Sequence, residues 1–176
     1  MDIQEFLHEY NRGDRNFSGL RLHGVDLRSA SLSSIDLSGA DLSGADLSGA
    51  DLSRANLERA NLTDADLVGA DLSGANLKHI NLIGADLSRA SLVGVDLSYA
   101  DLRTADLEQA DLQGAVLCEV ALSGANLTYT NLANAWIENI DLTPAELDHT
   151  SGRWVGSEVA DNAATTSSRW ISWGLH

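Results

Sequence analysis

Histidine and cysteine, the side chains that most often carry metal binding or nucleophilic chemistry, are few and widely separated in this chain. One cysteine allows no internal disulfide. No histidine or cysteine lies at the short spacing typical of metal ligands, and no glycine-rich loop has the spacing that binds phosphate. The sequence therefore predicts no catalytic site, no metal and no cofactor. The residues concerned are His8, His23, His79, His149, His176 and Cys118.

Carboxylates are the abundant charged groups. The chain holds 26 Asp and Glu residues against 11 Lys and Arg residues, which gives a formal net charge of −15. Binding to the phosphates of nucleic acid depends on Lys and Arg, so this balance argues against direct nucleic-acid binding. A strongly negative charge favours solubility or a basic protein partner.

Neither a targeting segment nor a membrane segment is predicted. The apolar residues near the start are spaced rather than contiguous, which is not typical of a secretory signal. No run approaches the roughly 18 apolar residues of a membrane span. We therefore expect a cytoplasmic protein that makes no contact with a membrane.

Most of the carboxylates belong to a five-residue repeat, which must position every outward side chain. Leucine recurs at every fifth residue from Leu22 to Leu147, with Ile137 the one exception, and Phe17 extends the series backwards. An α-helix turns by about 100° per residue, so a five-residue step would spread the leucines around the helix. The small residue two positions before each leucine instead indicates an extended segment, and the Ser-Gly pair that often follows indicates a turn.

A chain that turns a corner in every repeat must coil, with Leu and Ala inside. Successive coils would stack at about 4.8 Å, the usual separation of neighbouring strands. No coil buries its apolar residues alone, so stability comes from the neighbouring coils and the ends need caps.

The repeat has the form A-(D/N)-L-x-x, as in Ala40–Gly44, and closely resembles that of the pentapeptide-repeat family. The resemblance covers residues 16–147. It implies an all-β fold, a right-handed quadrilateral β-helix of about seven coils with one pentapeptide on each side. Residues 20 apart would then stack, and one interior column would consist of Leu42, Leu62, Leu82, Leu102 and Leu122.

Residues 1–15 are predicted to form a helical cap over the first coil. Asp2 suits the N-cap position and Glu5 follows it three residues later, while Gly13 suits the end of the helix. The segment Met1–Phe17 also resembles the amino-terminal cap of cyanobacterial pentapeptide-repeat proteins. The apolar side chains at helical spacing are Ile3, Phe6, Leu7 and Tyr10.

Residues 148–176 lie beyond the repeat and are predicted to form a C-terminal cap or tail. Trp154 is expected to cover the last coil. For Trp170 and Trp173 two roles stay open, namely packing on the chain itself or docking to another protein or to a second copy in a homodimer. The polar stretch 161–168 has no apolar period and is typical of a flexible segment.

Stacking at an interval of 20 residues predicts an acidic stripe along one column. Asp at this position can hydrogen-bond nearby backbone, which explains it without a function. Carboxylates about 5 Å apart also repel one another, which usually raises the pKa. The stripe consists of Asp26, Asp46, Asp66, Asp86 and Asp106.

The family resemblance implies one activity for such a stripe. Some pentapeptide-repeat proteins bind DNA gyrase by imitating the charge and girth of duplex DNA. Those proteins commonly place Phe at many central positions and interrupt the coils with loops. This chain has Phe centrally only at Phe17 and no interruption, which counts against this activity.

A second predicted surface, the decorated face, departs from the Ser and Gly residues that fill most outward positions. Large polar and aromatic side chains are typical of recognition surfaces, although scattered exposed residues are also normal. Trp136 stands out because it replaces the usual Asp or Asn. The decorated face consists of Glu58, Arg59, Lys78, His79, Tyr99, Glu119, Trp136 and Glu138, with Cys118 and Asn139 among them. Adjacent columns add Arg89, Glu108, Gln109 and Tyr129.

Three functions are compatible with these patterns. The first is a non-enzymatic scaffold that binds another protein through the decorated face. The second is an acidic DNA mimic that binds gyrase through the acidic stripe, and the third is a purely structural role. Catalysis is not expected, since His79 and Cys118 would lie about two coils, or roughly 10 Å, apart, too far for a nucleophile and its base.

Overall fold

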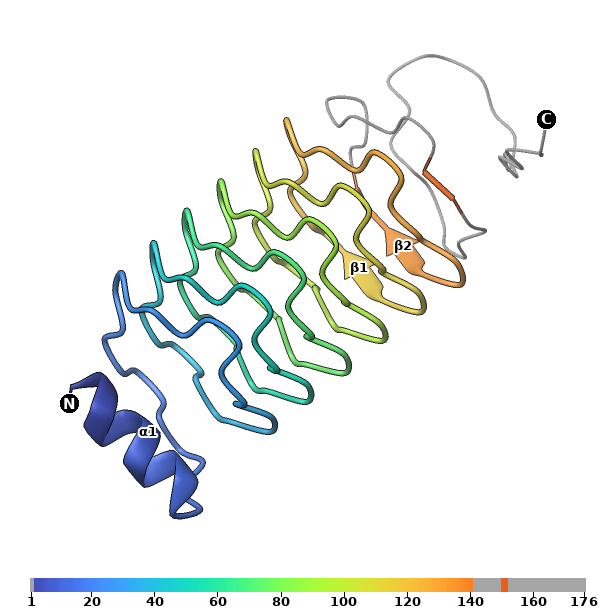
Figure 1. Cartoon of the computed structure of the whole chain (residues 1–176). Coiled ribbons are helices and arrows are strands. Elements are labelled where there is room, and N and C mark those ends of the chain that lie inside the picture. The colour runs from blue at the N-terminus through green and yellow to red at the C-terminus, as the bar shows by residue number, and fades with distance from the viewer. Residues whose placement is uncertain (1, 141–149, 152–176) are drawn as a thin grey trace, which may run out of the picture.

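The structure is a computed structural model that describes residues 2–140 and 150–151. It contains one helix, α1 (Ile3–Asn11), followed by a regular stack of coils (Figure 1). Two three-residue strands, β1 (Val116–Cys118) and β2 (Trp136–Glu138), lie side by side near the far end of the stack and pair in parallel. The chain therefore advances along one axis, from the helix through one coil after another.

Each coil consists of four pentapeptides, because parallel bridges join residues 20 apart. Asp41 pairs with Asn61 in this way, and Asn61 pairs with Asn81. The backbone N–H of Leu42 donates to the Asn61 carbonyl at 2.8 Å in the next coil. The N–H of Asp41 donates to the Leu20 carbonyl at 2.9 Å in the previous coil. Every pentapeptide in the middle of the stack is thus hydrogen-bonded on both sides, and the predicted 20-residue stacking is confirmed.

The corner of each pentapeptide is a tight turn built by the repeat itself. The N–H of Ala45 donates to the Leu42 carbonyl at 3.0 Å, and Gly44 between them has a φ of 63°. A positive φ at the third residue of a hydrogen-bonded turn is typical of type II turns. Before the corner, Asp41 Oδ1 accepts the N–H of Ser43 at 3.2 Å and its hydroxyl at 2.7 Å. Asp before leucine is therefore explained by local hydrogen bonding.

β1 and β2 each begin at a residue that cannot form this local hydrogen bond, although the unit that begins at Ala121 also lacks it and keeps the ordinary turn. Val116 and Trp136 replace the Asp or Asn of the repeat, and neither side chain can accept the N–H two residues on. The backbone is extended over three residues in both strands, and the corner after each is a bend rather than a hydrogen-bonded turn. The sequence predicted an extended segment in every unit, whereas most units contribute only one bridged residue.

The interior holds two kinds of side chain, as close packing in a narrow tube requires. Alanines such as Ala45 are buried beside the leucines. Thr130 occupies such a small position, and its buried hydroxyl donates to the Leu107 carbonyl at 2.8 Å. The leucines expected in one column are all buried, namely Leu42, Leu62, Leu82, Leu102 and Leu122.

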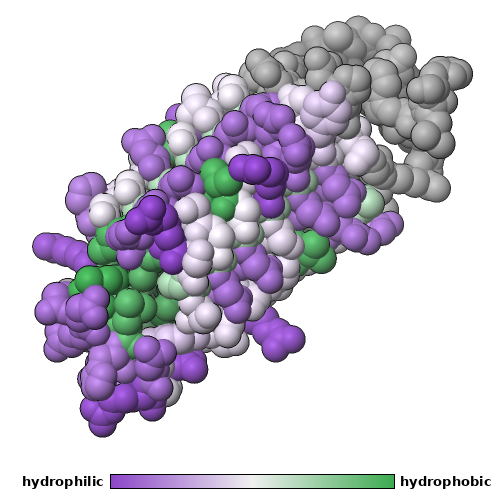
Figure 2. Space-filling model, viewed as in Figure 1, coloured by the Kyte–Doolittle hydropathy of each residue, from purple (hydrophilic) through white to green (hydrophobic). Residues whose placement is uncertain are grey.

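Helix α1 covers part of the first coil. Its N-cap is Asp2, whose Oδ1 accepts the N–H of Glu5 at 2.8 Å, as predicted. Phe6 is fully buried and meets Phe17 edge to face, with ring centroids 4.8 Å apart. Tyr10 is also buried, and its hydroxyl donates to the Ser33 carbonyl at 2.9 Å. Figure 2 shows hydrophobic surface around this end. The partly buried apolar residues packed against the core are Ile3, Leu7, Leu20, Val25 and Ala30.

At the other end, hydrogen bonding between coils reaches Ser151. The N–H of Leu132 donates to the Ser151 carbonyl at 2.7 Å, and the Thr150 hydroxyl donates to the Leu127 carbonyl at 3.0 Å. These contacts lie beyond residue 147, where the leucine repeat ends. The expected roles of Trp154, Trp170 and Trp173 fall outside the described residues.

Candidate functional site

In the described units, the second residue after each central residue occupies a corner where φ is positive. This left-handed region favours glycine, because the Cβ of any other residue approaches the following carbonyl oxygen at a cost of about 1–2 kcal/mol. Among the described residues, fourteen corners nevertheless carry a residue other than glycine, with φ between 54° and 63°. At these corners the chain keeps a side chain in spite of backbone strain.

The longest run of such corners lies on the decorated face. Glycine occupies the first two corners of this column, Gly19 and Gly39, and the next five are all non-glycine. Within the described residues, no other column has a run longer than three. Residues held in strained backbone conformations cluster at functional sites. The run consists of Arg59, His79, Tyr99, Glu119 and Asn139.

Charged residues in the N-terminal half of the decorated face neutralise one another. Arg59 Nη1 lies 2.7 Å from Glu58 Oε1, and Lys78 Nζ lies 3.0 Å from Asp96 Oδ2. The hydrogen bond and the charge of Asp96 raise the pKa of Lys78. Burial acts to raise the pKa of Asp96, but hydrogen bonds from Ser98 and the Lys78 ammonium together lower it. This half therefore carries little uncompensated charge.

An aromatic stack lies at the middle of the decorated face. His79 and Tyr99 are one coil apart in the same column, with ring centroids 4.9 Å apart and ring planes 9° from parallel. In spite of this contact, Tyr99 is 51% exposed. Exposed aromatic rings are enriched at protein–protein interfaces, where they contribute large contact area.

The C-terminal half of the decorated face carries carboxylates without a cationic partner. Trp136, at the start of β2, is 42% exposed, and its indole N–H donates to Glu138 Oε2 at 3.2 Å. The thiol of Cys118 lies 3.9 Å from the same oxygen; burial and the charge of Glu138 raise the pKa of this thiol, which favours its protonated form. Within residues 2–140 and 150–151, neither Glu119 nor Glu138 forms an ion pair.

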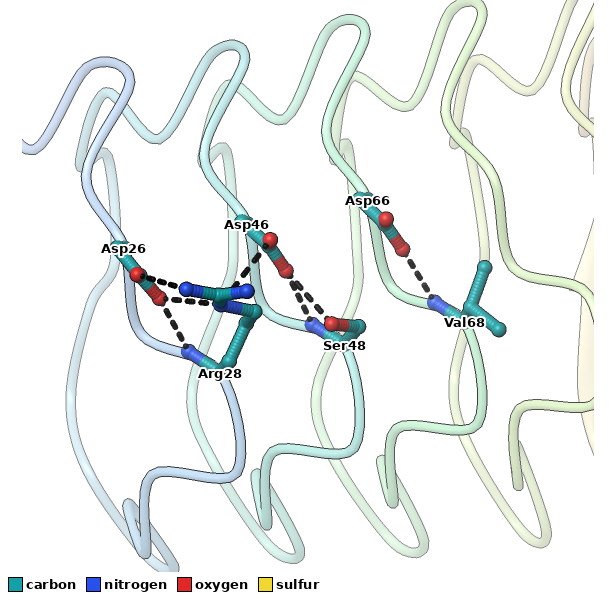
Figure 3. A network of polar contacts seen from close by, with 6 residues as sticks. All are labelled: Asp26, Arg28, Asp46, Ser48, Asp66 and Val68. Carbon is teal, nitrogen blue, oxygen red and sulfur yellow. Dashed lines mark hydrogen bonds and ion pairs between the residues drawn. The ribbon is translucent and has the colours of Figure 1, made fainter.

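The five aspartates of the acidic stripe are bridged one to the next along a single column, and Figure 3 shows the first three, Asp26, Asp46 and Asp66. Each carboxylate accepts the backbone N–H two residues further on, as in the bond from Ser48 to Asp46 at 3.1 Å and that from Val68 to Asp66 at 2.9 Å. Plain units of the repeat form the same bond, so the stripe needs no function to explain its aspartates individually.

A basic side chain occupies the N-terminal end of the stripe. Arg28 Nη2 lies 2.6 Å from Asp26 Oδ2, and Arg28 Nε lies 3.5 Å from Asp46 Oδ2 (Figure 3). Hydrogen bonds from Arg28 lower the pKa of Asp26. Repulsion between like charges predicted a raised pKa, and for Asp26 that expectation is wrong because the neighbouring guanidinium outweighs it.

Other columns relieve the repulsion between stacked carboxylates with asparagine. Asn61 Nδ2 donates to Asp41 Oδ1 at 3.2 Å, one coil away. In the acidic stripe this contact comes only at the end, where Asn126 Nδ2 donates to Asp106 Oδ1 at 3.1 Å. The stripe is therefore a column in which five carboxylates follow one another without an amide between them.

Few groups suited to catalysis meet in the part of the chain that the structure describes. There, no group of three or more His, Cys, Asp and Glu residues could hold a metal ion. A shallow depression of about 250 Å³ is lined by Ser88, Arg89, Glu108 and Gln109. Its Gln109 amide donates to Glu108 at 3.0 Å. No helix among the described residues is both long and apolar enough to traverse a bilayer.

Comparison with protein families identifies the repeat. The family described as pentapeptide repeats (8 copies) matches residues 14–44, 40–78, 70–109 and 105–143, which together cover most of the chain. The chain belongs to the pentapeptide-repeat family. A comparison with curated protein sequences found no match for this pentapeptide-repeat protein.

Solved structures similar to this pentapeptide-repeat protein include members of the family from cyanobacteria and plants. HetL, a pentapeptide-repeat protein involved in heterocyst differentiation regulation in the cyanobacterium Nostoc, shares 30% identity over 85% of this chain and 92% of its own, with a TM-score of 0.46. A protein of the Arabidopsis thaliana thylakoid lumen shares 32% identity over 65% of this chain and 69% of its own, with a TM-score of 0.52. QnrB1, a plasmid-mediated fluoroquinolone resistance protein, shares 22% identity over 79% and 86%, with a TM-score of 0.33.

The structure adds two features that the sequence alone did not single out. Asp96 and Ser98 complete the Lys78 contact, although Asp96 has the ordinary residue type for its position. Because the column assignment places Asp96 one coil from Lys78, the ion pair between them could have been predicted from the sequence. The backbone strain at the non-glycine corners could also have been predicted from the sequence, since glycine fills the same position in many other units.

Proposed function

We propose that this pentapeptide-repeat protein is a non-enzymatic scaffold that binds another protein through the decorated face. The observation that carries the proposal is the run of five consecutive non-glycine corners from Arg59 to Asn139. Gly39 adopts the same positive φ in the same column without a side chain. Five side chains kept in strained positions have a use other than stability of the coil.

Exposure of the large side chains supports the same surface. Tyr99 and Trp136 are two of the three large apolar or aromatic residues that are exposed among the described residues. Trp and Tyr contribute disproportionately to the energy of protein interfaces. A partner that covers both rings would remove this apolar surface from water.

We also propose the architecture that the family implies. The coil is right-handed and four-sided, with a capping region at residues 1–15, a repeat body at 16–147 and a C-terminal region at 148–176. The helix Ile3–Asn11 and the bridges between residues 20 apart support this division. A homodimer through the C-terminal region remains part of the proposal and concerns residues outside those described.

Glycine substitution gives a test that separates binding from folding. The variant His79→Gly, Tyr99→Gly and Trp136→Asn restores the plain repeat at three positions. Because it removes two strained corners, we expect its melting temperature to be no lower than that of the original chain. Affinity capture from extract of the native cells should recover a partner with the original chain and not with this variant.

A matched control uses strained corners elsewhere on the coil. The variant Arg54→Gly, Arg89→Gly and Tyr129→Gly also relieves positive-φ residues, and capture should be unchanged. The sequence placed Arg89 and Tyr129 in columns adjacent to the decorated face, which is wrong, because the bridges put their units in the column of the acidic stripe, half a coil away. Equal recovery of the partner by both variants would remove the decorated face as the binding surface. If no partner is recovered with any form of the chain, the purely structural role stands.

A second candidate, an acidic DNA mimic that binds gyrase, depends on the acidic stripe. The uninterrupted carboxylates from Asp26 to Asp106 favour it, and the contacts of Arg28 with the first two oppose it. The purified chain should then inhibit DNA supercoiling by gyrase, and substitution of all five aspartates with Asn should abolish the inhibition. A chain that leaves supercoiling unaffected eliminates this function.

A further inference from the structure

The two halves of the decorated face differ in how their charges are compensated. In the N-terminal half, Arg59 and Lys78 are each paired with a carboxylate of the same chain. In the C-terminal half, the units 96–100, 116–120 and 136–140 contain no Lys or Arg. Glu119 and Glu138 therefore have no cation within these three units. Lys78 reaches in from the previous coil only as far as Asp96, and no ion pair of residues 2–140 and 150–151 includes either glutamate.

Two exposed aromatic rings flank these carboxylates. Glu119 lies one coil beyond Tyr99 in the same column, and the N–H of Glu119 donates to the Glu138 carbonyl at 3.0 Å. Glu138 in turn accepts the indole N–H of Trp136, which fixes the carboxylate beside the ring. The carboxylate of Glu138 lies at the edge of the Trp136 ring. A guanidinium or ammonium group is attracted both by a carboxylate, through charge, and by the face of an aromatic ring, through its quadrupole.

We infer that the C-terminal half of the decorated face binds a basic segment of the partner protein, with an Arg or Lys side chain seated between Tyr99 and Trp136 against Glu119 and Glu138. This inference rests on the proposed binding function and names the chemistry of its partner. The surface is complementary to such a segment because, of its three carboxylates, only Asp96 is paired with a cation, Lys78, while Glu119 and Glu138 form no ion pair with the described residues. An acidic or neutral segment would leave the two carboxylates uncompensated.

The strands β1 and β2 suit this surface to an approaching chain. Val116–Cys118 and Trp136–Glu138 pair in parallel over three residues each and form a small extended platform. Trp136 stands where the repeat would place an Asp, at the edge of that platform. Glu138 belongs to the platform and pairs with Cys118, and Glu119 directly follows β1 and donates its N–H to the Glu138 carbonyl.

A peptide titration tests the inference with the full chain. The probe is acetyl-Gly-Arg-Gly-Arg-Gly-amide, added at near-physiological salt and followed by the Trp136 indole N–H resonance, which is assigned with Trp136→Phe. We expect a saturable shift of that resonance. The peptide in which citrulline replaces both arginines should bind at least about ten-fold more weakly, because it lacks the charge.

Two charge-matched variants separate the site from the general negative field of the chain. Glu119→Gln with Glu138→Gln should weaken the Arg peptide by about ten-fold, whereas Asp66→Asn with Asp86→Asn removes the same charge from the acidic stripe and should change the affinity by less than about two-fold. An unmoved Trp136 resonance, equal binding of the citrulline peptide, or equal weakening by both variants would overturn the inference. Failure of this inference is distinguishable from failure of the proposed binding function. If capture of the partner is lost with Tyr99→Gly and Trp136→Asn but kept with Glu119→Gln and Glu138→Gln, the decorated face is still the interface, but the partner segment that it binds is not basic.

Discussion

Residues 36–50 and the decorated face use the same backbone in two ways. Residues 36–50 read Asp-Leu-Ser-Gly-Ala three times over. There Asp accepts the N–H of Ser, Gly takes the left-handed corner and Ala fills the space beside Leu. On the decorated face, Tyr99 occupies a corner suited to Gly, and Trp136 replaces the Asp that would accept a backbone bond.

The comparison of the two regions distinguishes the positions that the coil requires for its stability from the positions that can vary. Leucine and the small residue before it stay buried in both, so the interior permits no such freedom. The outward positions can change without loss of the coil, but the changes at the corners oppose the local energy of the backbone. Side chains placed against that energy are where a function is to be sought.

Truncation of the interior should have the largest effect and should be the same in both regions. Leu42 and Leu97 are both fully buried, the first within the plain units and the second beneath the decorated face. We expect Leu42→Ala and Leu97→Ala each to lower the free energy of unfolding by about 3 kcal/mol, measured by urea denaturation. A much smaller loss for Leu97→Ala would show that the decorated units do not share the packing of the plain ones.

Exchange of residues within one corner column should have the next largest effect. Gly39 and Glu119 lie in the same column, and a Cβ on Gly39 would meet no atom within 4 Å. Gly39→Glu should therefore lower the free energy of unfolding through backbone strain alone, and Glu119→Gly should raise it, each by about 1 kcal/mol. If Glu119→Gly instead destabilises the chain, Glu119 serves the fold and the contrast between the regions fails.

Much of this contrast could be predicted from the sequence. Because Leu recurs without a slip, the 20-residue stacking and the columns follow from the family's geometry, and the helix over the first coil follows from Asp2 and the spacing of Phe6 and Tyr10. The formation of β1 and β2 was not predicted. Both begin where Val116 and Trp136 replace the Asp or Asn of the repeat, but Ala121 makes the same replacement and its unit keeps the hydrogen-bonded turn.

The division of the decorated face into two halves also required coordinates. All its charged residues were visible in the sequence, but their pairing depends on side-chain reach between neighbouring coils. Lys78 turns to Asp96, which belongs to the next coil, while Glu119 has no such partner among the described residues. Assigning residues to columns identifies which residues are neighbours. It does not show which of two neighbouring residues a long side chain contacts.

Asparagine in the acidic stripe should have a smaller, stabilising effect. Asn61 already donates to Asp41 one coil away, and Asp66→Asn would place the same amide beside Asp46. We expect Asp66→Asn to raise the free energy of unfolding by about 0.5 kcal/mol, more at low salt, and Asn61→Asp to lower it by a similar amount. Both are measured by urea denaturation at two salt concentrations. If the two substitutions change the free energy of unfolding by equal amounts in opposite directions, the acidic stripe and the Asn-containing columns follow the same electrostatics. If neither substitution changes it, solvent already screens the charges of the stripe.

The smallest predicted effect concerns the pKa of Asp96 on the decorated face. Its folded-state pKa is lowered, so its contribution to stability is present above the pKa of the unfolded chain and is lost as pH falls through the folded value. Lys78→Met removes one of the groups that lower this pKa, and the pKa of Asp96 should rise, although Ser98 still donates to the carboxylate. NMR titration of the side-chain carboxyl carbon measures the change, with Arg103→Met as a control that should move Asp101 and leave Asp96 unchanged. If Asp96 titrates identically with and without Lys78, the ion pair between them does not persist in solution. The N-terminal half of the decorated face would then offer an unpaired ammonium group to a partner, just as the C-terminal half offers carboxylates that form no ion pair.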